Sequence, residues 1–324
     1  MKVSFVSDTR RFLRKTLSLS LFLTVFLSFL FPFALRAEPE ERGEPKSLFL
    51  WNKEIQYQLL LHPDSKATFD GESFARVKEG TTTHFVVLNP AFLEKEGREL
   101  FHRLSLQAKN KIFEPSPALV SLEKKVLSQD SSCKIPRKDR SIRKALEILQ
   151  SSLEDSAWAP AWLEAVRGSA TKKEAEVRFV QHFTKERLAT LEVHEVAHLI
   201  DLEDHGDDGS PNYDRFTELN AFFSELAYSS NPKDVMAQAL SGLIDEMDEG
   251  KATDYSGSKV GQVLSFLNKN LSSHPRNQGF SCGWKNLTHL NNPDFAEAGK
   301  ALYLENHQAF ASLGGAANFS PSGE

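Results

Sequence analysis

The run His194-Glu195-Val196-Ala197-His198 is the part of this sequence whose residue types and spacing could do chemistry. Residues four positions apart on an α-helix lie on one face, about 40° apart in projection, so His194 and His198 can reach one metal ion. Imidazole nitrogens are preferred zinc ligands, and Glu195 points to the flank, where its carboxylate can reach a zinc-bound water. The pattern predicts His194 and His198 as Zn²⁺ ligands and Glu195 as the catalytic base. The alternative is a pair of surface histidines on an ordinary amphipathic helix.

Two helices must position this chemistry. The first is expected to begin at Thr171, because Thr171 and Glu174 form a capping-box pattern, and its apolar periodicity runs to about residue 202. The apolar content is dense around the two histidines, which predicts a buried helix at the floor of a cleft. An acidic, glycine-containing loop follows, and a second helix is expected from about Asp214 to Tyr228.

Glu218, on the second expected helix, is predicted to complete the site, because a catalytic zinc takes three protein ligands. At this point the sequence resembles the gluzincin group of zincin metallopeptidases, in which a glutamate on the next helix is the third ligand. Glu218 follows His198 by 20 residues, a spacing also found in the thermolysin-like branch. The small Ala221, one turn later, would let the two helices approach closely. The resemblance covers about 35 residues, from Leu191 to Glu225.

Asp204 is the alternative third ligand. It falls where the metzincin pattern, His-Glu-x-x-His-x-x-Gly-x-x-His/Asp, has its third ligand. Asp201 replaces the glycine at which the metzincin chain turns sharply, and aspartate adopts that left-handed conformation less well than glycine. Asp201 is therefore interpreted as a hydrogen-bond acceptor for a ligand histidine or as a polar residue at the helix end. Glu225 and His205 are further alternatives for the third ligand.

The N-terminal part of the chain has the patterns of strands, and the rest has the patterns of helices. Apolar runs bounded by turn signals lie at residues 48–51, 57–61 and 81–88. His84, in the last run, is expected on an edge strand beside the cleft, by analogy with zincins that bind extended peptides. After Pro90 the pattern becomes helical.

The expected fold class is α+β, dominated by helices. The resemblance implies a zincin-like fold, in which a small N-terminal sheet packs on the metal-binding helix and the ligand helix follows. The expected domain covers residues 48–315, with strands in 48–90 and helices in 91–315. Residues 38–47 are expected to be a linker, and residues 316–324 a disordered tail.

Residues 1–37 are expected to be an export signal. Four basic residues between positions 10 and 15 precede an uncharged run rich in leucine and phenylalanine, residues 16–35, and Ala37 is the expected last residue of the signal. The uncharged run is long enough to span a bilayer if it is not cleaved, so an N-terminal anchor is the alternative. In both cases the domain is expected outside the cytoplasm, secreted or periplasmic.

The two cysteines, Cys133 and Cys282, flank the histidine motif. In an oxidising compartment an even pair of cysteines forms a disulfide by default, so we expect Cys133 and Cys282 to be joined. The spacing of the two cysteines resembles neither a zinc site nor a redox motif. The alternative to a disulfide is therefore two buried thiols.

Charge and motif together define the expected function. The formal net charge is −5, and no basic patch with interleaved aromatic residues is present, so we expect no nucleic-acid partner. The expected function is that of an exported zinc metallopeptidase, a hydrolase of protein or peptide substrates that contacts a membrane only through an uncleaved N-terminal segment. One alternative is a non-catalytic zincin-fold binding or scaffold protein of the cell envelope with a structural or absent metal. Another is a membrane-tethered assembly factor in which the histidine pair is incidental.

Overall fold

The computed structural model describes residues 43–62, 70–78, 81–109, 140–206, 211–248, 259–271 and 290–312. Three predictions lie outside these ranges: the export signal at residues 1–37, the disulfide between Cys133 and Cys282, and the tail at residues 316–324. Within the described ranges, no helix has the length and apolar character needed to cross a membrane.

The strands form one mixed sheet of four strands. They are β1 (Glu44–Leu50), β2 (Lys53–Leu61), β3 (Gly71–Lys78) and β4 (Thr81–Leu88). The order across the sheet is β1-β2-β4-β3, so β1 and β3 are its edges. The β1–β2 and β3–β4 pairs are antiparallel, whereas β2 and β4 are parallel.

Strand β1 begins inside the segment predicted to be a linker, residues 38–47. The strand starts at Glu44, which pairs with Leu59, and Pro45 pairs with Gln58. A proline cannot donate a ladder hydrogen bond, so it is tolerated on an edge strand, where one side of the backbone has no partner strand. The charge and proline content of this segment therefore indicated a linker where an edge strand had already begun.

Seven helices are described, and they confirm a helix-dominated α+β fold. They are α2 (Pro90–Lys109), α4 (Arg140–Arg167), α5 (Lys172–His205), α6 (Pro211–Tyr228), α7 (Pro232–Asp248), α8 (Lys259–Leu271) and α9 (Asn292–Ser312). The predicted start of α5 is confirmed, since the Thr171 side chain accepts a hydrogen bond of 3.2 Å from the Glu174 amide. Helix α6 begins three residues before the predicted Asp214.

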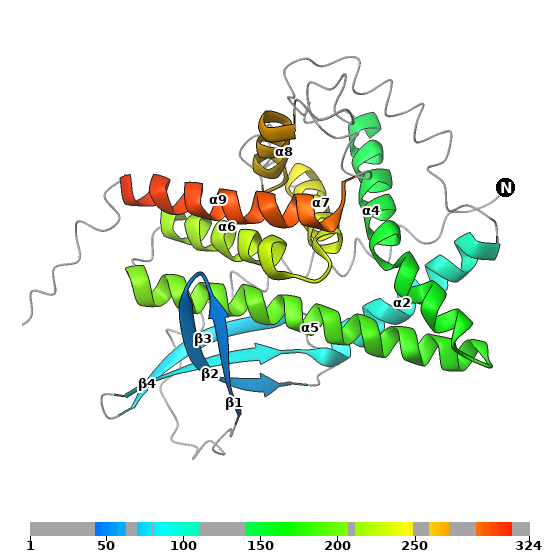
Figure 1. Cartoon of the computed structure of the whole chain (residues 1–324), viewed down its shortest axis with the longest axis horizontal. Coiled ribbons are helices and arrows are strands. Elements are labelled where there is room, and N and C mark those ends of the chain that lie inside the picture. Colours follow the sequence, from blue (N-terminus) through cyan, green and yellow to red (C-terminus); the bar gives the residue numbers. More distant parts are fainter. Residues whose placement is uncertain are drawn as a thin grey trace, which may run out of the picture.

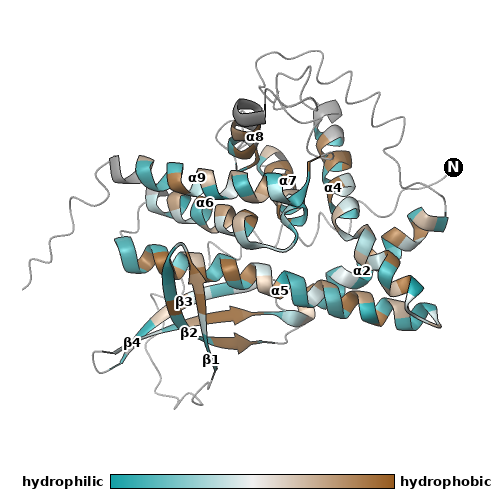
Figure 2. Ribbon diagram, in the orientation of Figure 1, coloured by the Kyte–Doolittle hydropathy of each residue, from teal (hydrophilic) through white to brown (hydrophobic). Residues whose placement is uncertain are grey.

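Helix α5 is the central element of the fold. It lies between the sheet on one side and α6 and α9 on the other (Figure 1). Its sheet-facing residues Val196, Leu199 and Ile200 pack in one apolar cluster with Val86 and Leu88 of β4. Figure 2 shows hydrophobic residues along the sheet and α5 where the two face each other. Because both sides of α5 are covered here, the stretch around the histidine motif, residues 190–201, is largely buried.

The β1–β2 turn fixes the sheet against the helices on the far side of α5. Trp51 and Asn52 both have positive φ angles, 51° and 66°, as a tight two-residue hairpin turn requires. The Trp51 ring stacks on Tyr303 of α9 at a centroid distance of 3.7 Å, and its indole nitrogen donates a hydrogen bond of 2.7 Å to Ser224 of α6. The hairpin thus links the sheet to the two helices that pack behind the site.

A buried ion pair joins α5 to α7 at the other end of the molecule. The Nη1 atom of Arg187 lies 3.1 Å from Oδ2 of Asp234, and Asp234 also accepts a hydrogen bond of 2.8 Å from the indole nitrogen of Trp158. Arg187 and Asp234 are both buried. Because removing one partner would leave the other charge buried without compensation, this pair fixes how α5 and α7 meet.

Candidate metal centre

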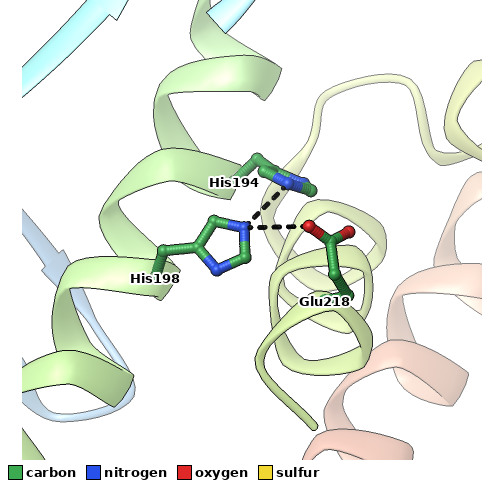
Figure 3. A group of neighbouring side chains, drawn as sticks. All are labelled: His194, His198 and Glu218. Atoms are coloured by element: carbon green, nitrogen blue, oxygen red, sulfur yellow. Dashed lines mark hydrogen bonds and ion pairs between the residues drawn. The ribbon is translucent and has the colours of Figure 1, made fainter. Parts of the chain in front are cut away.

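Helices α5 and α6 bring His194, His198 and Glu218 together. Figure 3 shows the two imidazoles projecting from one face of α5 toward the carboxylate of Glu218 on α6. The Nε2 atoms of His194 and His198 are 3.1 Å apart, and Nε2 of His198 lies 3.7 Å from Oε1 of Glu218. One ligand atom from each residue lies within 4.8 Å of the other two. Among the described residues, this is the one group of three or more possible ligands so close together.

The donor set fits zinc. Two imidazole nitrogens and one carboxylate oxygen form a common ligand set of catalytic zinc sites, and a zinc–nitrogen bond measures about 2.0–2.1 Å. In a tetrahedral site, ligand atoms are therefore about 3.4 Å apart. The two separations that involve His198, 3.1 Å and 3.7 Å, lie on either side of this value.

Glu225 is the partner of the other ring nitrogen of His194. The Nδ1 atom of His194 lies 3.3 Å from Oε1 of Glu225, which comes from the same helix as Glu218. Burial lowers the pKa of His194, but the charge of Glu225 outweighs it, with smaller contributions from Glu195 and Glu218, and raises this pKa to about 9. The sequence pattern made Glu225 one of the alternative metal ligands. In the structure it contacts His194, one of the candidate ligands.

His198 and Glu218 have the protonation states that a metal requires. Burial and the charge of His194 hold the pKa of His198 below its usual range, so its imidazole is neutral at pH 7. Burial raises the pKa of Glu218, but the charge of Lys259 and of the two histidines outweighs this effect and lowers it. The Nζ atom of Lys259 lies 3.0 Å from Oε2 of Glu218. Glu218 therefore carries its negative charge with a cation beside it.

Glu195 lies on the flank of α5 and faces the first residues of β3. A side chain at Gly71 would place its Cβ atom 3.1 Å from Oε1 of Glu195, so glycine allows this close approach. Burial raises the pKa of Glu195 to about 7, while His194 and a hydrogen bond from Ser73 lower it in part. A carboxylate with a pKa near 7 can accept a proton and release it again at neutral pH.

Asp204, the alternative third ligand, is not part of this group. Its carboxylate forms an ion pair with Lys53 at the start of β2. Helix α5 continues to His205, so the chain does not turn at Asp201 as the metzincin pattern requires. His205 packs with its ring 5.3 Å from that of Phe216 and is also outside the group.

Asp201 contacts a buried polar network rather than a ligand histidine. It is fully buried and accepts hydrogen bonds of 2.9 Å and 3.1 Å from the side-chain nitrogen of Asn220, two residues after Glu218. The same nitrogen lies 3.1 Å from Nε2 of His307, and Asn306 donates a hydrogen bond of 2.7 Å to Asn220. The network joins α5, α6 and α9 next to the candidate metal ligands. The predicted contact between Asp201 and a ligand histidine is replaced by this network.

Strand β3 and Lys259 were not predicted from the sequence. Residues 71–78 contain few large apolar residues, so their strand character is weak, although they contact Glu195. Lys259 follows Glu218 by 41 residues, and no local motif connects the two. The prediction for His84 was wrong, because β4 lies inside the sheet and the neighbouring edge strand is β3. His84 forms an ion pair of 3.1 Å with Glu203.

In comparisons with protein-family models, curated proteins and solved structures, no match to this chain was found.

Proposed function

We propose that this protein is a zinc-dependent metallohydrolase that cleaves peptide bonds. The observation that carries the proposal is the grouping of His194, His198 and Glu218 within 4.8 Å beside a buried Glu195 whose pKa is raised to about 7. A metal with a purely structural role needs no such base. The separation of roles, three ligands and one nearby carboxylate outside the ligand group, is the arrangement that zinc hydrolases use.

Each residue of the site would have a distinct role in the reaction. A bound zinc ion would polarise the substrate carbonyl and lower the pKa of a water. Glu195 would accept a proton from that water and deliver it to the leaving amine, which its pKa near 7 permits in both directions. Glu225 would hold the His194 ring so that Nε2 faces the metal. Asn220 and Asp201 would keep the two ligand helices in register.

The edge strand β3 supports a peptide as the substrate. Its first residues contact Glu195, and as an edge of the sheet it presents backbone hydrogen-bonding groups on one side. An extended peptide can pair with such an edge and so pass beside Glu195. A zincin-like architecture, in which the sheet packs on the metal-binding helix, is therefore part of the proposal. The export of the domain, based on residues 1–37, is also part of it.

A second candidate function is that of a non-catalytic binding protein in which the metal is absent. It has support from the ion pairs of the site, because Lys259 neutralises Glu218 and Glu225 neutralises protonated His194 without a metal. The position of Glu195 favours the first candidate, since its buried carboxylate comes from the same helical turn as the two histidines and lies outside the ligand group.

The test is hydrolysis of a mixture of unstructured proteins by the purified protein, with cleavage followed by mass spectrometry. The proposal predicts cleavage that is lost with a chelator, restored by zinc and absent in the His198→Ala variant. Cleavage that persists in His198→Ala would come from a contaminant or another site and would contradict the proposal. No cleavage by a zinc-loaded wild-type protein would favour the binding protein.

A further inference from the structure

A cavity lies beside the candidate metal centre, between α6, α7 and α8. Its volume is about 220 Å³. The residues around it are Phe222, Glu225, Val235, Gln238, Ala239, Gly242, Leu243, Glu246 and Lys259. Those from α7 recur every three or four residues, so they occupy one face of that helix.

Two of these residues also contact the metal ligands. Glu225 lies 3.3 Å from His194, and Lys259 lies 3.0 Å from Glu218. The cavity is therefore directly adjacent to the ligand group. A substrate bound at the metal would have its neighbouring side chains within reach of this cavity.

The cavity has the size of one side chain. Sites for drug-sized molecules measure roughly 300–1,000 Å³, so 220 Å³ is too small for such a ligand. Phe222, Val235 and Leu243 are buried and give it an apolar floor. Gly242 lies at its exposed rim, and a Cβ atom added there would meet no atom within 4 Å. The absence of a side chain at Gly242 keeps the entrance wide.

The charges around the cavity favour a cation. Glu225 and Glu246 contribute two carboxylates, and Lys259 contributes the one ammonium group of the lining. Lys259 is paired with Glu218, and Glu225 is paired with His194, and both of these partners lie outside the lining. Among the described residues, Glu246 is therefore the carboxylate of the lining whose charge is not balanced by an ion pair. A lysine or arginine side chain fits this combination, because its aliphatic stem can pack on apolar residues while its charged end stays near carboxylates at the rim.

We propose that this cavity is a specificity pocket that binds a lysine or arginine side chain of the substrate next to the bond that is cleaved. The inference rests on the proposed function for the position of the cleaved bond. Glu246 is the residue that selects the positive charge, and Gly242 is the residue that leaves room for the long side chain.

The test measures binding and cleavage separately. Fluorescent peptides with an alanine and glycine host sequence carry one lysine, arginine, norleucine or glutamate, and norleucine has the stem of lysine without its charge. Binding is measured by fluorescence anisotropy with zinc-supplied protein in which Glu195→Gln prevents turnover. Cleavage is measured with the protein that retains Glu195. The variants are Gly242→Ala, Gly242→Leu and Glu246→Gln, with Glu164→Gln on the exposed surface of α4 as the control.

The inference predicts that lysine and arginine peptides bind about five- to tenfold more tightly than the norleucine peptide. Glu246→Gln should remove most of this preference. Gly242→Ala should weaken binding of the basic peptides slightly and Gly242→Leu strongly, although leucine is the better helix former, so the fold is retained. Glu164→Gln should change nothing.

Equal binding of lysine and norleucine peptides, no binding of any peptide, or binding of the basic peptides that is not weakened by Gly242→Leu would overturn the inference. A basic preference in binding without any cleavage would contradict the proposed hydrolase and leave the pocket supported. Cleavage without a basic preference would support the hydrolase and contradict the pocket.

Discussion

The Nδ1 atom of His194 lies 3.3 Å from Oε1 of Glu225, one residue on the motif helix and one on the helix that carries Glu218. This contact has two effects on the metal centre. It places a carboxylate beside the ring nitrogen that does not face His198, and it stabilises the protonated form of His194, whose pKa is raised to about 9. A zinc ion must displace that proton, because only a neutral imidazole can bind metal.

Zinc affinity is therefore expected to rise with pH. Below about pH 9 the metal-free protein holds a proton on His194, whereas the lowered pKa of His198 leaves that residue neutral. Between pH 6 and 8 we expect the affinity to increase about tenfold per pH unit, with about one proton released per zinc bound. Zinc titrations with a competing chelator at several pH values measure this slope.

The control for this dependence is Glu225→Gln, which removes the charge that raises the pKa of His194. In this variant the affinity should depend much less on pH above pH 7. If the wild-type protein bound zinc equally well at pH 6 and pH 8, the assigned protonation state of His194 would be wrong.

Glu195→Gln should separate metal binding from hydrolysis. Glu195 is outside the group of three ligands, so the variant should bind zinc as the wild type does. Loss of the general base should lower the hydrolysis rate by about 10²–10⁴-fold. Metal content and peptide cleavage measured on the same preparation give both numbers. Wild-type activity in the variant would remove Glu195 from the mechanism.

Asp201 should make the stability of the metal-free protein depend on pH. Burial raises its pKa from 3.8 to about 8, so the folded state keeps a proton that the unfolded state loses near pH 4. The resulting stabilisation is complete below about pH 4 and is lost as pH rises to about 8. His307 has the opposite effect, because its lowered pKa costs stability below its usual value of 6.5. His194, whose pKa is raised to about 9, also loses stabilisation between pH 6.5 and 8, so the contribution of Asp201 is obtained as the difference between the wild type and a variant of Asp201.

Asp201→Asn provides the measurement. In the presence of a chelator, the difference in Tm between wild type and variant should fall from pH 6.5 to 8 by several degrees, since 1 kcal/mol corresponds to about 2–4 °C for a domain of this size. A difference in Tm that is constant across this range would mean that Asp201 is ionised in the folded protein.

Asp234→Ala should destabilise the fold strongly without touching the site. It would leave the buried Arg187 without its partner and the indole nitrogen of Trp158 without its acceptor. The expected loss in the free energy of unfolding is about 3–5 kcal/mol, measured by urea denaturation. Glu164→Ala on the exposed face of α4 is the control and should change it by less than about 0.5 kcal/mol. A small effect of Asp234→Ala would show that Arg187 is solvated.

Local patterns in the sequence predicted the helices and the core of the site. The Thr171 cap and the spacing of His194 and His198 are short-range features that an isolated helix already contains. The helix-dominated α+β class follows from hydrophobic periodicity, and the structure confirms it.

These local patterns did not predict the tertiary contacts. Strand β3 has weak strand propensity and forms because β4 and α5 cover it. Lys259 and His307 come from later helices, and only the folded chain brings them to Glu218 and Asp201. The contact of Asp201 with Asn220 could not be predicted, because a sequence does not say how two helices are rotated relative to each other.

The metal content of the purified protein, measured beside the Glu218→Ala and Asp204→Ala variants, tests the central claim most directly. Glu218 lies within 4.8 Å of both histidine ligands, whereas Asp204 pairs with Lys53. We predict about one zinc ion per chain in the wild type and in Asp204→Ala, and a strong loss in Glu218→Ala. A wild-type protein that takes up no zinc when the metal is offered, or a Glu218→Ala variant that keeps it, would contradict this account.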